Sequence, residues 1–122
     1  MTEPALTETV PPGIHLLIDF WEARNLSDVA GVDQAMRAAA AACGATVLNV
    51  MLHAFGDGEG AGVTGVAILA ESHISIHTWP ELGYVALDVF MCGACDPHLA
   101  LPVLRAYFKP GREAVQAIRR GR

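Results

Sequence analysis

Lysine is nearly absent from this sequence of 122 residues. Lys109 is the only lysine, and it stands beside Pro110 in an expected turn. An enzyme that depends on pyridoxal phosphate needs a positioned lysine, which holds the cofactor as an internal Schiff base. A single lysine in a turn therefore makes the chain a poor candidate for that cofactor. A glycine-rich phosphate-binding loop of the usual spacing is also missing.

Signals for membranes and nucleic acids are missing as well. The longest apolar runs are far shorter than a bilayer span, and no basic segment followed by an apolar one marks a secretory signal. The net charge is −5 and no large basic cluster is present, so neither a membrane nor a nucleic acid is an expected partner. The negative charge fits a small cationic substrate, or only an ordinary surface.

Cysteines are few and odd in number, with three in the chain. An odd count does not suit a disulfide framework, which is typical of small secreted domains. We therefore expect free thiols and a location in the reducing cytoplasm.

The composition and the apolar patterns predict one globular α+β domain. Apolar residues make up 52% of the chain and charged residues 17%, which excludes a disordered chain. Residues 1–12 are rich in proline and are expected to form a flexible tail, whereas residues 13–122 form the single domain. The order of elements predicts two layers, with helices on one face of a sheet. The expected strands are 13–21, 45–55, 63–71, 72–78, 84–91 and 113–119, and the expected helices are 25–43 and 98–108.

Local patterns refine these elements. The first helix is expected to have Ser27 or Asn25 as its N-cap and to stop at Gly44. The strand at 63–71 is continuously apolar, which predicts burial on both faces. The basic end, 119–122, is expected to be a solvated tail. In the strand at 45–55, one apolar face is expected to hold Leu48, Val50, Leu52 and Ala54.

The stretch from Glu71 to Glu81 concentrates reactive side chains, with two histidines, two serines and two carboxylates directly after an apolar run. Polar groups at the end of a core strand often mark a functional site. Strand periodicity puts Ser72 on one face and His77 on the other. A Ser–His pair would then need a bend in the strand or a histidine from a second subunit, and we favour the second subunit.

Three other readings of these residues stay open. His73 and His77 could ligate a metal together with Glu71 or Glu81, although no third ligand has a recognisable spacing. A Ser/His/Asp hydrolase would lack the Gly-x-Ser-x-Gly elbow that this class often carries. Cys92-Gly93-Ala94-Cys95 matches C-x-x-C at a strand-to-helix junction, where a thioredoxin-like role is conceivable. A single reactive thiol at Cys92, with Cys95 as a packing residue, is the simpler interpretation.

Aromatic residues flank the central stretch. Phe55 and Trp79 could stack on a planar ligand, and Trp79 could equally be a core or interface residue. The three remaining histidines and Cys43 belong to no recognisable constellation, and we treat them as structural. These histidines are His15, His53 and His98.

The stretch from Glu71 to Glu81, followed by Phe90-Met91-Cys92-Gly93, strongly resembles the prokaryotic S-adenosylmethionine decarboxylase proenzymes. The similarity extends from Gly13 to about Phe108. The resemblance implies a proenzyme that cuts itself between Glu71 and Ser72. The serine would become a covalent pyruvoyl group, which would form a Schiff base with the substrate amine. That cofactor would account for the scarcity of lysine, and no metal is implied.

Residue roles carry over by motif match. His77 would promote the elimination step of processing, and Thr64 would support processing where the family usually has serine. Cys92 would protonate the substrate carbon after decarboxylation. Phe55 would stack on adenine, and Glu81 would accept hydrogen bonds from the ribose hydroxyls.

The family resemblance also implies a fold, an assembly and a pathway. The fold would be a two-layer sandwich with an antiparallel sheet, and two sheets would pair in a homodimer, or a higher oligomer, of processed protomers. The product would supply aminopropyl groups for spermidine synthesis. Relatives with the same processing motif include decarboxylases of ornithine or arginine, and the pocket loops of this chain differ most from the common pattern. Those substrates, and a non-catalytic regulatory homologue, remain the alternatives.

Overall fold

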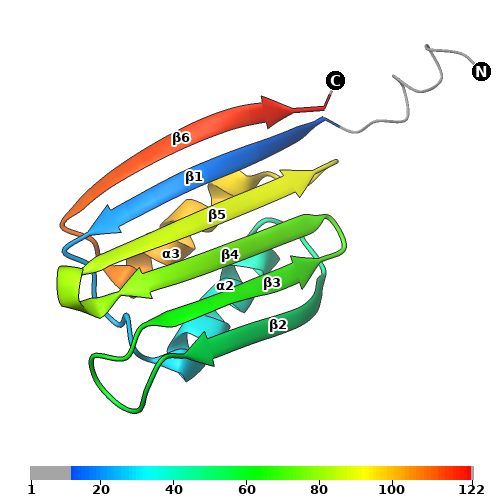
Figure 1. The fold of residues 1–122 in the computed structure, drawn as a ribbon. Coiled ribbons are helices and arrows are strands. Elements are labelled where there is room, and N and C mark those ends of the chain that lie inside the picture. The colour runs from blue at the N-terminus through cyan, green and yellow to red at the C-terminus, as the bar shows by residue number, and fades with distance from the viewer. Residues whose placement is uncertain (1–11, 122) are drawn as a thin grey trace, which may run out of the picture.

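The computed structural model describes residues 12–121, so the expected tail at 1–12 lies outside the described residues except for Pro12. The chain forms a six-stranded sheet and two α-helices, with two short 3-10 helices (Figure 1). The strands are β1 (Gly13–Trp21), β2 (Val47–Ala54), β3 (Val63–Leu69), β4 (Ser72–Trp79), β5 (Tyr84–Cys92) and β6 (Arg112–Arg120). The helices are α2 (Val29–Ala42), η1 (Pro80–Leu82), η2 (Pro97–Leu99) and α3 (Ala100–Phe108).

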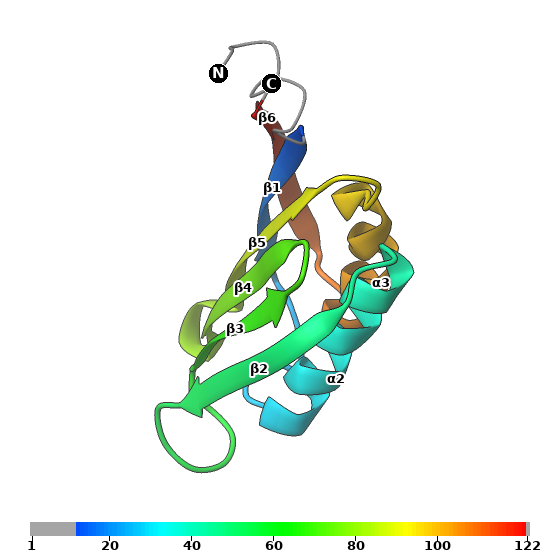
Figure 2. The same cartoon turned by 90° about the vertical axis from the view of Figure 1, so that its right-hand side faces the viewer.

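The sheet has the order β2-β3-β4-β5-β1-β6, and all neighbouring strands are antiparallel. Both helices cover the same face of this twisted sheet (Figure 2). The predicted α+β class, the antiparallel sheet and the single helical layer are therefore confirmed. We call the opposite side of the sheet the open face, because no other element of residues 12–121 covers it (Figure 2).

The core lies between the sheet and the helices, and strand alternation builds it. In β1 and β5, every second residue points toward the helices, as a period of two requires. Phe20 from β1 meets Phe108 from α3, with ring centroids 6.3 Å apart. Alanines of α2 let this helix approach the sheet closely, and Ala39 and Ala40 are fully buried.

The start of α2 differs from the prediction. Asp28 is the N-cap, and its side chain accepts a 3.0 Å hydrogen bond from the backbone N–H of Gly31. The two expected caps are used elsewhere: the Asn25 amide donates to the carbonyl of Tyr107, and the Ser27 hydroxyl accepts from the N–H of Gly60. The predicted helix end is confirmed, because α2 stops at Ala42 and Gly44 has a φ of +79°.

The expected faces of β2 and β3 were partly wrong. The β2–β3 register shifts between Val47 and Asn49, and this bulge turns Leu48 outward, where it is 62% exposed. Ile68 of β3 is 41% exposed because it lies on the open face, so β3 is not buried on both faces. The expected solvated tail is also corrected, because Arg119 and Arg120 pair with β1 inside β6.

Thr78, near the end of β4, connects three segments of the chain. It is buried, and its hydroxyl accepts from the N–H of Val63 and donates to the carbonyl of Leu26, both at 2.8 Å. This oxygen therefore fixes the start of β3 against the segment before α2. No helix within residues 12–121 is long and apolar enough to span a bilayer.

We expect Leu104→Ala to lower the free energy of unfolding by about 2–5 kcal/mol, because it leaves a cavity in the core under α3. Leu104 is 0% exposed. Leu48→Ala makes the same chemical change at an exposed site and should shift stability by no more than about 0.5 kcal/mol. Urea unfolding measures both variants, and equal losses would contradict the assigned core.

Candidate active site

The central stretch becomes β4, and its reactive residues lie at the two ends of that strand. Ser72 begins β4, where it is paired with Met91 of β5. His77 lies five residues further along the same strand. At the rise of a β-strand, that separation is about 16 Å. The side chains of Ser72 and His77 therefore do not meet within one chain.

At the first end, Glu71, Ser72 and Cys92 form what we call the Ser72 cluster. The carbonyl oxygen of Glu71 accepts hydrogen bonds from the N–H of Cys92 at 3.2 Å and from its Sγ at 3.3 Å. The backbone of Ser72 has a φ of 147°, a region that non-glycine residues rarely occupy and that stores strain. Two donors and a strained residue thus surround the peptide bond between Glu71 and Ser72.

The Glu71 side chain anchors the residue before this peptide bond to Thr46. Its Oε1 accepts from the N–H of Thr46 at 2.9 Å, and the N–H of Ala70 donates to the carbonyl of Thr46 at 2.9 Å. The turn between β3 and β4 is therefore anchored to the start of β2. The contribution of Thr46 was not predicted, because a loop threonine 25 residues from Glu71 in the sequence carries no pattern that marks it.

At the other end, Phe55, Thr64, His77 and Glu81 form what we call the His77 cluster. These residues and Trp79 line one cavity of about 470 Å³. Oγ1 of Thr64 lies 2.5 Å from Nδ1 of His77, so the hydroxyl fixes the orientation of the imidazole ring. Phe55 follows β2 and is 67% exposed, so its ring is free to contact a ligand.

An aromatic stack on the open face supports this cavity. Trp79 stacks on Tyr84, which stacks on Trp21, with ring centroids 5.2 Å and 5.8 Å apart. The guanidinium of Arg112 covers the far end of the stack, 4.3 Å from the Trp21 ring. The Tyr84 hydroxyl donates to the carboxylate of Asp19. Trp79 therefore lines the cavity and is also part of a packed aromatic stack.

A third group lies in the middle of the open face. Asp88 binds Nε2 of His15 at 3.0 Å and accepts from the Ser75 hydroxyl at 3.0 Å. His15, which was expected to be structural and to belong to no constellation, therefore shares Asp88 with Ser75. The Ser/His/Asp hydrolase geometry is not formed here, because Asp88 bridges the other two groups and His15 does not contact the serine.

In the described part of the chain, the positions of His73 and His77 do not support a shared metal site. His73 lies beside His15 and Phe90, whereas His77 faces Thr64. Within residues 12–121, no three His, Cys, Asp or Glu side chains are grouped to hold an ion. Burial is the main cause that lowers the pKa of His73, and the neighbouring His15 and Arg120 lower it further while Asp88 opposes them.

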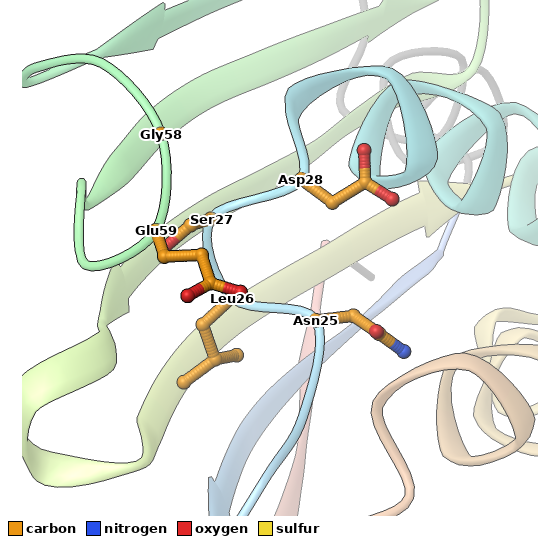
Figure 3. A pocket seen from close by; sticks show the side chains of 6 residues that line it. All are labelled: Asn25, Leu26, Ser27, Asp28, Gly58 and Glu59. Carbon is orange, nitrogen blue, oxygen red and sulfur yellow. The ribbon is translucent and has the colours of Figure 1, made fainter.

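Another cavity, of about 450 Å³, lies between the segment before α2 and the glycine-rich loop (Figure 3). Glu59 of the loop reaches over Leu26, while Asp28 directs its carboxylate toward the start of α2, which it caps (Figure 3). The acidic groups therefore do not converge on one point. This cavity shares no lining residue with the cavity of the His77 cluster.

Comparison with known proteins points to one family. A family model described as S-adenosylmethionine decarboxylase matches residues 14–121. The chain is 46% identical over 112 residues to an S-adenosylmethionine decarboxylase proenzyme of Methanococcus maripaludis, covering 89% of each chain. It is 46% identical over 110 residues to a protein of the same name from Thermomicrobium roseum, covering 89% of this chain and 93% of that one.

A solved structure agrees with these sequence matches. The crystal structure of the adenosylmethionine decarboxylase from Aquifex aeolicus superposes with a TM-score of 0.79 at 30% sequence identity, covering 92% of both chains. The fold described above is therefore similar to that of a protein with the same family name.

We expect Tyr84 to remain protonated to unusually high pH. The hydrogen bond to Asp19, with burial and the charges of Asp19 and Asp88, raises the pKa of Tyr84 to about 12. A raised folded-state pKa stabilises the fold below the ordinary tyrosine pKa of about 10, and this stability is lost as pH rises toward 12. Absorbance at 295 nm in a Tyr107→Phe background, which leaves one tyrosine, measures this titration.

Asp19→Asn tests the cause of the shift, because it removes the charge and weakens the hydrogen bond. The pKa of Tyr84 should then move back toward about 10. Asp33→Asn on the surface of α2 is the control and should leave the titration unchanged. An unmoved Tyr84 in Asp19→Asn would contradict the assigned contact.

Proposed function

The chain belongs to the S-adenosylmethionine decarboxylase family, and we propose that it is a proenzyme that cuts itself between Glu71 and Ser72. The processed enzyme then decarboxylates S-adenosyl-L-methionine and so supplies the aminopropyl donor for spermidine synthesis. The matched relatives carry the proenzyme name over nearly the whole length of the chain, which supports this function.

The observation that carries the proposal is the environment of the Glu71 carbonyl. Ser72 Oγ attacks this carbonyl carbon, and negative charge develops on the oxygen. The N–H and the Sγ of Cys92, at 3.2 and 3.3 Å, already donate to that oxygen and stabilise the charge. Strain in the backbone of Ser72, with its φ of 147°, is relieved when the bond to its nitrogen breaks.

The remaining processing steps need a base. Breakage of the C–N bond leaves an ester between the Glu71 acyl group and Ser72 Oγ. Removal of the α-proton of Ser72 then expels the Glu71 carboxylate by β-elimination, and water replaces nitrogen, which leaves as ammonia. We assign the proton transfer to His77, whose ring is oriented by Thr64 at 2.5 Å.

His77 can act on Ser72 only from a second copy, because the two residues lie about 16 Å apart on one strand. We therefore propose a homodimer in which two open faces pack together. A two-fold axis across β4 reverses the strand direction, which brings the His77 cluster of one copy to the Ser72 cluster of the other. Exposed apolar side chains on the open face support this assembly, and they are Met51, Ile68, Trp79 and Ile118.

The residues around position 72 fit a pyruvoyl group better than pyridoxal phosphate. Lys109 caps the C-terminal end of α3 and lies in neither cluster. The pyruvoyl group supplies a carbonyl that captures the substrate amine and an electron sink for carboxylate loss. Cys92 Sγ, which lies 3.3 Å from the Glu71 oxygen, holds a proton beside this position and donates it to the substrate carbon that loses CO₂.

The cavity of the His77 cluster suits a nucleoside. Its volume of about 470 Å³ lies within the usual range for small-molecule sites. We assign adenine stacking to Phe55 and acceptance of the ribose hydroxyls to Glu81. Ornithine and arginine carry no adenine ring and no ribose hydroxyls, so they would engage Glu81 only through their positive charge, and the pairing of an exposed aromatic ring with a carboxylate favours S-adenosylmethionine.

Self-cleavage is the first test. We expect intact mass spectrometry to find two fragments, 1–71 and 72–122, with the second lighter than a serine-started peptide because it carries a pyruvoyl group. Ser72→Ala removes the attacking hydroxyl and should stay one inactive chain. Cleavage of Ser72→Ala at the same bond would contradict the mechanism.

The same mass-spectrometric assay of Cys92→Ala separates the contribution of the Cys92 thiol from that of its backbone N–H. The N–H of residue 92 remains, so this variant should still cut itself, slowed by up to about 100-fold through loss of one donor. Its decarboxylation should fail, because the proton donor is gone. Cys43→Ala, a buried thiol outside both clusters, is the matched control and should process normally.

Substrate choice is tested at Glu81. Glu81→Gln keeps one acceptor but loses the charge, so we expect the KM for S-adenosylmethionine to rise by roughly 10-fold or more, as for a hydrogen bond to a charged group. Glu59→Gln on the neighbouring loop is the matched control and should leave KM unchanged. Release of CO₂ is measured with S-adenosylmethionine, ornithine and arginine, and activity confined to the last two would reject the nucleoside assignment.

A further inference from the structure

Cys95 has no role in the function proposed above, although it lies three residues after Cys92. Cys92 ends β5, Gly93 and Ala94 form a turn, and Cys95 precedes η2. Gly93 has a φ of +72°, a conformation that lets the chain reverse tightly at this point. The two thiols therefore lie at the two ends of one short turn.

The turn brings the cysteines within reach of a disulfide. In a four-residue turn, the first and last Cα atoms lie less than about 7 Å apart. Disulfides join residues whose Cα atoms are about 4.4–6.8 Å apart. Both cysteines are half-buried, and both residues between them are exposed, so a small oxidant reaches the turn from solvent.

We propose that Cys92 and Cys95 are a redox modification site, at which a reversible disulfide withdraws the Cys92 thiol from the active site. The predicted loss of activity rests on the proposed function, whereas formation of the bond does not. Cytosolic disulfides are typically transient and sensing rather than structural, which suits a pair placed beside a reactive thiol.

The chemistry is a two-electron oxidation. A peroxide converts the Cys92 thiolate to a sulfenic acid, and one oxygen of the peroxide leaves as water. The Cys95 thiolate then attacks the Cys92 sulfur, which forms the S–S bond and releases the second oxygen as water. In total, two thiols and one hydrogen peroxide give one disulfide and two waters, and a dithiol reductant reverses the change.

The disulfide acts on one specific contact. Cys92 Sγ loses its hydrogen and can no longer donate to the Glu71 carbonyl, which it does at 3.3 Å in the reduced chain. The backbone N–H of Cys92 keeps its own bond to that oxygen at 3.2 Å. Oxidation should therefore slow self-cleavage and abolish proton delivery to the substrate.

Cys95 is held as a thiol at neutral pH. Burial raises its pKa, and the nearby Glu71 and Cys92 raise it further. Since the thiolate is the attacking species, the disulfide should form faster as pH rises.

Cys43 is the competing partner, since it lies close enough to Cys95 for the two to influence each other's charge. It is 5% exposed and packs in the core at the end of α2. Burial raises the pKa of Cys43 to about 11, so it is rarely a thiolate near neutral pH. Burial therefore shields Cys43 from an oxidant in the solvent, whereas Cys92 and Cys95 are both half-buried.

The self-cleavage site separates these pairings in one experiment. Cys43 lies in fragment 1–71, while Cys92 and Cys95 both lie in fragment 72–122. The processed protein is treated with diamide, which takes up two hydrogens from a dithiol, and its fragments are then separated under denaturing conditions without reductant. We expect two separate fragments, with fragment 72–122 two hydrogens lighter, and a loss of decarboxylation of at least about 10-fold that dithiothreitol reverses.

Two variants complete the test. Cys95→Ala should keep its activity in diamide, and Cys43→Ala should still lose two hydrogens. Fragments that stay joined without reductant would mean a Cys43 disulfide and would overturn the proposal, as would an unchanged mass. If the chain does not cut itself, the intact mass still reports the bond, so failure of the proposed function is distinguished from failure of this site.

Discussion

The register between β4 and β5 is the constraint on which the site depends. Ser72 pairs with Met91, and this alignment delivers the N–H and the Sγ of Cys92 to the carbonyl of Glu71. A slip of one residue would turn every side chain of β4 to the other face and take the thiol away from that carbonyl. The buried residues on the helical side of β4, Ile74 and Ile76, oppose such a slip because they would leave the core.

The sequence predicted the parts of the fold that strict alternation specifies. Leu16, Ile18 and Phe20 mark the buried side of β1 without ambiguity, and the five-residue spacing of Ser72 and His77 along β4 places them near its two ends. Prediction from strand alternation failed where one extra residue interrupts the period of two. The bulge at Leu48 turns this side chain to the solvent, and no residue type near Leu48 predicts a bulge in the pairing of β2 with β3.

Contacts between segments that are distant in the sequence could not be predicted either. His15 and Asp88 are 73 residues apart, and Tyr84 and Asp19 are 65 apart. Each pair meets only because β1 pairs with β5, a neighbour that alternation alone does not predict. The Ser72 cluster could be proposed through a family resemblance, but the two hydrogen bonds to Glu71 follow from the pairing of β4 with β5, which no sequence pattern specifies.

The strand order has a mechanical consequence for a chain cut between β3 and β4. The first fragment would hold β1, β2 and β3, and the second would hold β4, β5 and β6. Because β1 lies between β5 and β6, a strand of the first fragment would be hydrogen-bonded on both sides to strands of the second fragment. The fragments could separate only if β1 lost its hydrogen bonds to both β5 and β6. The cut chain would therefore remain one folding unit without a covalent link.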